Sequence, residues 1–232
     1  MKLRCVFILL IFAFKSFLAL AQTEQKTSIV FHPMFGNSIL TPNNLFYSLG
    51  NNGDSIQIET FKFYISAIEL LKDDKIVWKE ENSFHLINVA DEKSLTIFIP
   101  GASNTVYNTI SFNLGIDSLI NVSGAMGGDL DPTKGMYWTW QSGYVNLKLE
   151  GRSNLCKSRN NEFQFHLGGY QYPFNTLQKV ILKVEENKKI DIVLDIKNFI
   201  ESIDLSQQNQ IMSPNKQAVL LSEKAVGIFS VK

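Results

Sequence analysis

Three histidines are the side chains of this 232-residue sequence best suited to binding a transition metal: His166, His32 and His85. Copper accepts imidazole and soft sulfur ligands. His32 precedes Met34 by two residues, so the two side chains either form a nitrogen and sulfur pair suited to copper(I) or simply lie at the end of a strand. His166 has polar neighbours on its own strand parity, as expected either of a ligand or of a hydrogen-bonded surface histidine. His85 alternates with apolar residues, which favours a histidine that lies in the core with its ring nitrogens hydrogen-bonded. We therefore rank the candidate ligands as His166, then His32, then His85.

A glycine-rich segment, residues 115–144, holds a second group of candidate metal ligands. Asp117, Asp129 and Asp131, together with Asn121, offer the oxygen ligands that calcium prefers, although their spacing is not that of an EF-hand. The same side chains commonly form turns and accept hydrogen bonds from backbone amides without any metal. We favour turn formation and capping and keep a calcium site as a minor alternative.

The same segment ends in aromatic residues, among them Trp138 and Trp140. In an extended chain, residues two positions apart point to the same side, so the two indoles are expected to lie together. Large aromatic side chains usually belong to a hydrophobic core, which makes an aromatic core beneath a long loop the simplest interpretation. The alternative is that the two tryptophans belong to a functional site.

Signatures of catalysis are missing from the sequence. It contains no Gly-x-Ser-x-Gly elbow, no His-Glu-x-x-His motif and no phosphate-binding glycine loop. Cys156 has no adjacent histidine and no clearly electropositive surroundings, so it is not a convincing nucleophile. We therefore expect a protein that is not an enzyme.

The first 21 residues have the pattern of a cleavable signal peptide. A basic start, with Lys2 and Arg4, precedes an apolar run, and Ala19 and Ala21 place small residues before the cleavage point. Lys15 interrupts the apolar run, which is then shorter than the roughly 20 residues that a transmembrane helix needs. We expect residues 1–21 to be removed, leaving no transmembrane anchor and a mature protein in the periplasm, at the cell surface or secreted.

Charge argues against a nucleic-acid partner. Removing Lys2, Arg4 and Lys15 with the leader reduces the 22 Lys and Arg residues to 19, against 22 Asp and Glu, a formal charge of about −3. Nucleic-acid binding rests on clustered Lys and Arg, which this chain does not show.

The mature chain, residues 22–232, is predicted to form one all-β domain. Short segments with alternating apolar residues, separated by turn residues, are typical of an antiparallel β-sandwich or barrel. The alternation changes phase near Glu59 and Thr60, which predicts either a β-bulge or a strand break there. Residues 218–221 and 226–231 are predicted to be the closing strands, and the glycine and aromatic segment forms a long loop.

Motifs along nearly the whole mature chain resemble those of the MbnP-like copper-binding family, named after a periplasmic protein associated with methanobactin operons. The run Gly135 to Gly151, G-M-Y-W-T-W-Q-S-G-Y-V-N-L-K-L-E-G, resembles the family signature. The other resembling segments are Lys62 to Ser66, Phe84 to Asn88, Phe112 to Pro132, Phe165 to Gly169 (the His-x-Gly-Gly element) and Ile211 to Phe229.

The resemblance implies a β-sandwich that binds copper through histidine together with kynurenine, an oxidised tryptophan. It also implies a partner dihaem protein, related to the enzyme MauG, that carries out the oxidation. The matching residues are Trp138 and Trp140, but this chain departs from relatives that carry tryptophan-x-histidine, because it has Trp138-Thr139-Trp140. The departure places the geometry of the copper site in question.

Two hypotheses about function follow. The first is an exported copper-binding protein that stores, chaperones or delivers copper, with a site built from Trp138 or Trp140 plus His166 and His32. The second is a non-catalytic interaction module outside the cytoplasm, in which the aromatic loop binds a protein or a glycan without metal, since exposed aromatic residues are effective contact residues.

Overall fold

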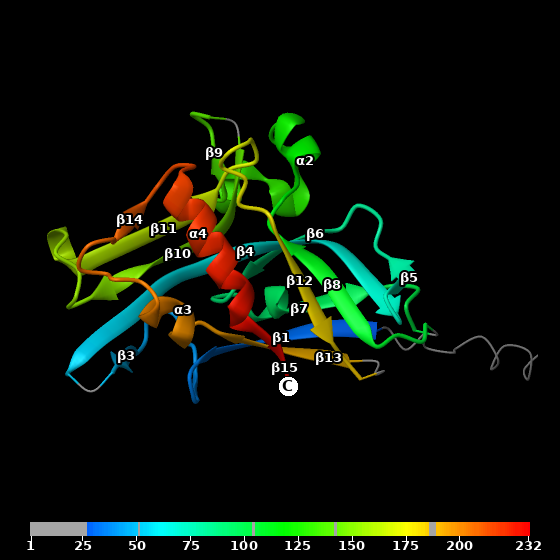
Figure 1. Ribbon diagram of the computed structural model, residues 1–232, viewed down its shortest axis with the longest axis horizontal. Helices are drawn as coiled ribbons and strands as arrows, with labels where there is room; N and C mark the ends of the chain where they lie inside the picture. Colours follow the sequence, from blue (N-terminus) through cyan, green and yellow to red (C-terminus); the bar gives the residue numbers. More distant parts are fainter. Residues whose placement is uncertain (1–26, 51, 104, 142, 186–188) are drawn as a thin grey trace, which may run out of the picture.

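The computed structural model describes residues 27–50, 52–103, 105–141, 143–185 and 189–232 (Figure 1). The predicted signal peptide, residues 1–21, lies outside the described residues. Within the described part, no helix is long and apolar enough to cross a membrane.

Two β-sheets face each other around one large hydrophobic core, which confirms the predicted β-sandwich. The five-stranded sheet contains β1 (Thr27–Phe35), β2 (Ser38–Ile39), β7 (Thr96–Ile99), β13 (Lys189–Asp195) and β15 (Phe229–Val231). The ten-stranded sheet contains β3 (Phe46–Leu49), β4 (Asp54–Lys72), β5 (Lys75–Lys79), β6 (Phe84–Asn88), β8 (Thr109–Leu114), β9 (Tyr137–Trp138), β10 (Gly143–Ser153), β11 (Glu162–Gly168), β12 (Gln178–Lys183) and β14 (Gln210–Ile211).

The sheets are mixed, although the sequence predicts antiparallel strands. β1 pairs with β13 in parallel, from Ser28 opposite Lys189 to Met34 opposite Asp195. β11 and β14 are also parallel. Antiparallel direction is enforced only where a short hairpin joins two strands, and here each parallel pair is joined by a long stretch of chain. Alternation in the sequence reports which side chains are buried and carries no information about strand direction.

The long strand β4 organises the larger sheet, because β3, β5, β6, β8 and β10 all pair with it (Figure 1). Opposite β10, the register runs from Thr60 facing Glu150 to Ile58 facing Gly151, so Glu59 is the extra residue. The predicted bulge is therefore confirmed. It keeps both Ile58 and Phe61 in the core on either side of the phase change.

One predicted closing strand is wrong. Residues 218–221 belong to α4 (Lys216–Ala225), which packs beside β11 (Figure 1). Asn215 caps the helix by accepting a hydrogen bond from the backbone N–H of Ala218. Ala218, Leu221, Ser222 and Ala225 are buried, at the spacing of one helical face. The other segment, residues 226–231, contains a short 3-10 turn and then β15.

Residues 115–144 fold into a compact cap on the outer side of the larger sheet. The cap contains α2 (Ser118–Val122), two short 3-10 turns and β9, and it has a small hydrophobic core of its own. That core consists of Tyr64, Leu86, Ile116, Leu130, Met136, Trp138, Tyr144 and Val145. The cap is thus a structured unit anchored on β4, β6 and β10, where the sequence predicts a loop. In the described part of the chain, the remaining α-helix is α3 (Lys197–Glu201), which is drawn near the lower end of α4 in Figure 1.

Candidate functional site

The two tryptophans of the cap lie together but in different environments. Trp138 is in β9, which pairs with the start of β10, and only 7% of its surface is exposed. Trp140 is in the turn that follows and is 63% exposed. Their ring centroids are 5.8 Å apart with an interplanar angle of 44°. The core interpretation therefore applies to Trp138, whereas Trp140 presents its ring to solvent.

The two glycines of the His-x-Gly-Gly element allow close packing, Gly168 against the Trp138 ring and Gly169 against Phe174 and Pro214. A Cβ atom on Gly168 would lie 2.7 Å from Cζ3 of Trp138 and 2.8 Å from the carbonyl oxygen of Tyr144. Gly169 has φ +131°, and its Cβ would lie 2.3 Å from the carbonyl oxygen of Phe174. Only glycine has both the conformational freedom and the small size that these contacts require.

His166 lies on the outer face of β11, the face against which Trp138 packs at Gly168. It is two residues before Gly168 on the same strand parity, about 7 Å along an extended chain. The alternate residues Phe163, Phe165 and Leu167 point into the main core, so His166 faces away from that core, as the sequence predicts. The ring is nevertheless buried.

A carboxylate and a lysine of β10 surround the His166 ring. Nε2 of His166 is 2.7 Å from Oε1 of Glu150, and Nζ of Lys148 is 3.5 Å from the same oxygen. Burial on its own would raise the pKa of Glu150, but the His166 hydrogen bond and the charge of Lys148 outweigh it and lower the pKa to about 2. Glu150 is therefore ionised at neutral pH and can only accept, so Nε2 carries the proton and Nδ1 keeps the lone pair of the neutral ring.

Glu150 should make the fold sensitive to acid. A folded-state pKa of about 2, below the ordinary value of 4.5, means that this carboxylate stabilises the fold above pH 4.5. The contribution, on the order of 2 kcal/mol, is lost as the pH falls from 4.5 towards 2. Glu150→Gln should lower the free energy of unfolding at pH 7, and this free energy should then fall less steeply between pH 5 and 3, measured by urea denaturation.

Glu223→Gln, at an exposed position of α4, is the control and should change the free energy of unfolding at pH 7 by less than about 0.5 kcal/mol. Equal acid sensitivity in wild type and Glu150→Gln would contradict the assignment.

The other two histidines lie elsewhere. His32 is in the five-stranded sheet, where its Nε2 is 2.6 Å from Oδ1 of Asp191. His85 is in β6, with Nε2 2.8 Å from Oε2 of Glu80. Between β6 and β11 stand β4 and β10, and neighbouring strands are about 4.8 Å apart, which separates His85 from His166 by at least ~14 Å.

The structure therefore does not bring His166, His32 and His85 into one site. In the described part of the chain, no group of three or more His, Cys, Asp or Glu side chains is placed to hold a metal ion. Each histidine instead has its own carboxylate partner. Of the three, only His166 lies on the strand against which Trp138 packs. Cys156 is buried and unpaired, and burial raises the pKa of its thiol.

All four oxygen-rich side chains of the cap make hydrogen bonds within the protein, and two of them, Asp117 and Asp131, cap helical turns as the favoured interpretation predicts. Asp117 accepts from the backbone N–H of Ile120 at the start of α2, and Asp131 accepts from the backbone N–H of Thr133. Asp129 accepts from the backbone N–H of Leu86 and pairs with Lys134 at 2.6 Å. Asn121 bonds to backbone groups within the cap.

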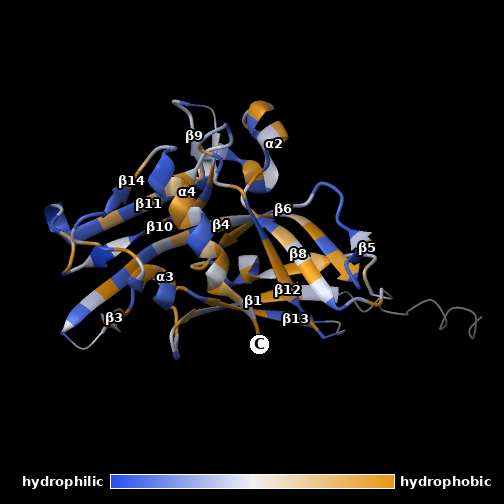
Figure 2. Cartoon of the chain, in the orientation of Figure 1, coloured by the Kyte–Doolittle hydropathy of each residue, from blue (hydrophilic) through white to orange (hydrophobic). Residues whose placement is uncertain are grey.

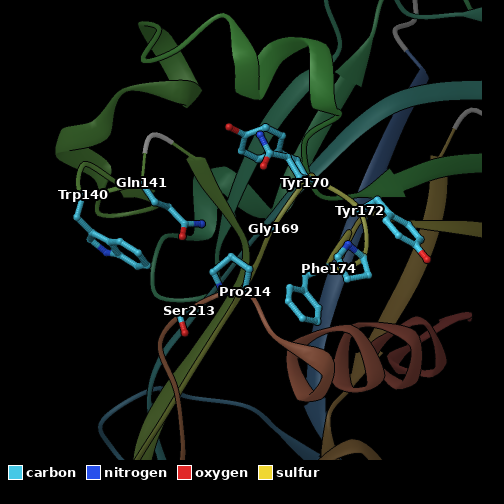
Figure 3. A pocket seen from close by; sticks show the side chains of 10 residues that line it. Trp140, Gln141, Gly169, Tyr170, Tyr172, Phe174, Ser213 and Pro214 are labelled. Carbon is cyan, nitrogen blue, oxygen red and sulfur yellow. The ribbon is translucent and has the colours of Figure 1, made fainter.

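An aromatic pocket opens beside the exposed tryptophan (Figure 3). We use this name for the cavity of about 570 Å³ lined by Trp140, Gln141, Gly169, Tyr170, Gln171, Tyr172, Pro173, Phe174, Ser213 and Pro214. In Figure 3, Trp140 and Gln141 lie on one side, Phe174 and Tyr172 on the other, and Pro214 between them. Tyr172 is 97% exposed.

Sequence reasoning missed the residues that complete both parts of this site. Glu150 and Lys148 stand on polar positions of an ordinary strand, and their role depends on the pairing of β10 with β11. The aromatic residues 170–174 follow directly on the His-x-Gly-Gly element, so the run G-G-Y-Q-Y-P-F was the signal that could have indicated a binding loop.

Fold and site together define a β-sandwich protein with an aromatic cap over a histidine and carboxylate pair. A family model described as MbnP matches residues 24–213, and the chain belongs to the MbnP family. A solved structure, MbnP from Methylosinus trichosporium, aligns with a TM-score of 0.64 and 16% identity, covering 89% of this chain and 97% of that chain. At this identity the likeness shows the fold. No curated protein matches the chain.

Proposed function

We propose that this protein is an exported copper-binding protein that stores, chaperones or delivers copper, with its site between Trp138, Trp140 and His166. The observation that carries the proposal is the position of His166. It is the one histidine of the three on the face of β11 against which Trp138 packs, in a chain that belongs to the MbnP family. The signal peptide pattern of residues 1–21 supports a location outside the cytoplasm.

The environment of His166 fits a metal-binding imidazole. Metal-binding histidines usually donate one ring N–H to a carboxylate, which fixes the tautomer and directs the other nitrogen at the metal. His166 donates Nε2–H to Glu150, and no further hydrogen bond to the ring is made within the described residues. Copper accepts the free Nδ1 as a ligand.

A further donor is needed, because one imidazole and one carboxylate are an incomplete donor set and an indole ring does not ligate copper. Oxidation of Trp138 or Trp140 to kynurenine would supply an aromatic amine and a carbonyl oxygen beside His166. The exposed ring of Trp140 is the one that an oxidising partner protein, such as a dihaem protein, could reach directly. The partner and the modification both belong to the proposal.

Replacing His166 should remove the copper site. The variant His166→Gln keeps a donor for Glu150 but has no imidazole nitrogen for the metal. Mature wild-type protein purified from its own host should retain a stoichiometric amount of copper after dialysis, measured by elemental analysis, and His166→Gln should retain less than a tenth of that amount.

His32→Gln and His85→Gln are matched controls, since each removes a carboxylate-paired histidine at a distance from the tryptophans. Both should retain copper as the wild type does. Intact mass and peptide mapping of the same samples would locate kynurenine at position 138 or 140, because this conversion adds one oxygen to the tryptophan side chain and removes one carbon from it. Unchanged copper retention in His166→Gln, or loss only in His32→Gln, would sink the proposed site.

A further inference from the structure

We infer that the aromatic pocket, which shares Trp140 with the proposed copper site, is a binding site for a neutral oligosaccharide and does not need bound metal. The pocket lies on the solvent side of Trp140 and is walled by the chain segments 169–174 and 213–214. Its volume of about 570 Å³ falls within the ordinary range of small-ligand sites.

The side chains of the pocket match the two kinds of surface that a sugar ring presents. The flat faces of Trp140, Tyr172 and Phe174 suit the C–H faces of a pyranose, because aromatic rings bury large apolar area at little entropic cost. The amides of Gln141 and Gln171 and the hydroxyl of Ser213 can donate to and accept from ring hydroxyls. A wholly apolar ligand would leave these polar groups unpaired.

Charge is absent from the lining of the pocket. None of the ten lining residues is Asp, Glu, Lys, Arg or His. Asp, Glu, Lys and Arg together make up 19% of the chain. Protein surfaces normally intersperse both signs of charge. A charged ligand would therefore find no counter-charge in the pocket, which favours a neutral one.

Exposed apolar residues extend the same surface towards α2. Leu119 and Val122 project from α2, and Met126 and Trp140 follow at the same end of the molecule, where Figure 2 shows hydrophobic residues on the outside of α2. Exposed apolar side chains that gather on one part of a protein are a common feature of interaction sites.

The walls of the pocket are fixed before any ligand arrives. The carbonyl oxygen of Gly169 accepts from both the backbone N–H and the hydroxyl of Thr176, which closes the loop 169–176. Pro214 packs within contact distance of Gly169. A preformed site loses less conformational entropy on binding than a mobile loop does.

A proline-rich peptide is the competing occupant, since such peptides also dock in aromatic grooves. Peptide recognition also uses the flanking side chains of the peptide, and the uncharged lining of this pocket offers no partner for charged flanks. Hydroxyl groups spread around a ring, by contrast, match polar groups on several walls. The observations therefore favour the sugar, and the peptide becomes an outcome of the test.

Affinity electrophoresis of the mature protein, treated with a chelator to remove metal, tests the inference. The probes are the neutral polysaccharides xyloglucan, galactomannan, barley β-glucan, laminarin and dextran, with alginate as an anionic comparison and decaproline as a competitor. Wild type should be retarded by at least one neutral polysaccharide. Tyr172→Ala and Phe174→Ala should weaken that retardation at least tenfold.

Phe98→Ala is the matched control, because Phe98 is an exposed aromatic residue of β7 in the other sheet. It should leave retardation unchanged. Circular dichroism would verify that each variant is folded, and both pocket variants change exposed side chains that the core does not need.

Four outcomes would each overturn the inference: retardation by none of the neutral polysaccharides, retardation by alginate alone, full binding by both pocket variants, or displacement by decaproline. None of these outcomes bears on the copper site, since Tyr172 and Phe174 are not among its ligands.

Discussion

Replacing Trp138 by alanine should destabilise the folded protein by about 3–5 kcal/mol, whereas Trp140→Ala should cost less than about 1 kcal/mol. Trp138 is almost fully buried in the small core of the cap and packs directly on Gly168. Its removal takes away the transfer energy of a large side chain and leaves a cavity between the cap and β11. Trp140 is largely in solvent, so alanine at that position removes few contacts.

Urea denaturation of mature protein produced without an oxidising partner would measure the two values. Trp140→Ala is the matched control, since both variants delete an indole from the same motif. Equal destabilisation by the two substitutions would contradict the division into a buried and an exposed tryptophan. Trp138→Phe should recover much of the loss, because a smaller ring fills part of the same space.

Alternating hydrophobicity made the sandwich predictable. Alternation along β8, β11 and β13 identifies which residues are buried, and the phase change at Glu59 identifies a bulge, because the side-chain period of a strand is two. The short segment 218–221 shows the limit of the method. A run of four residues rich in Ala, Val and Leu fits a strand or a helix. In the structure this run is helical, and the side chain of Asn215 caps the start of the helix.

Pairing between strands made the site unpredictable. His166, His32 and His85 stand on strands whose neighbours depend on contacts between distant parts of the chain. The sequence could rank the histidines by parity but could not place His166 on the face against which Trp138 packs. That placement depends on the hairpin of β9 and β10 and on the lack of a side chain at Gly168. The carboxylate partner of each histidine is likewise a product of strand pairing or of a tight turn.

In the cap, the local sequence predicted the hydrogen-bonding roles of two acidic residues correctly. Asp117 and Asp131 stand where acidic residues commonly accept hydrogen bonds from the first turn of a helix, and the structure has them in this role. The resemblance of Gly135 to Gly151 to the family signature is confirmed by the family match over residues 24–213. The fold of the cap, with its separate core, arises from long-range contacts to Tyr64 and Leu86 that no local pattern reveals.

Asn146 links the cap to the loop 169–176, and Asn146→Ala should therefore destabilise the protein by about 2–4 kcal/mol. This buried residue lies at the irregularity of β10, between Val145 and Leu147. Its Oδ1 accepts from the backbone N–H of Ile116 in the cap at 2.9 Å, and its Nδ2 donates to Oγ1 of Thr176 at 2.9 Å.

Alanine at position 146 would leave a buried donor and a buried acceptor without partners, which is more costly than the loss of the hydrogen bonds themselves. Urea denaturation measures the destabilisation, and hydrogen exchange should show faster exchange at residues 169–176, the wall of the aromatic pocket. Asn113→Ala is the matched control, because the Asn113 side chain makes no hydrogen bond within the described residues, and it should change stability by less than about 0.5 kcal/mol. If Asn146→Ala were as mild as its control, the cap and the pocket loop would be independent of each other. The single amide of Asn146 would then not be the link through which the cap and the loop 169–176 share one rigid support.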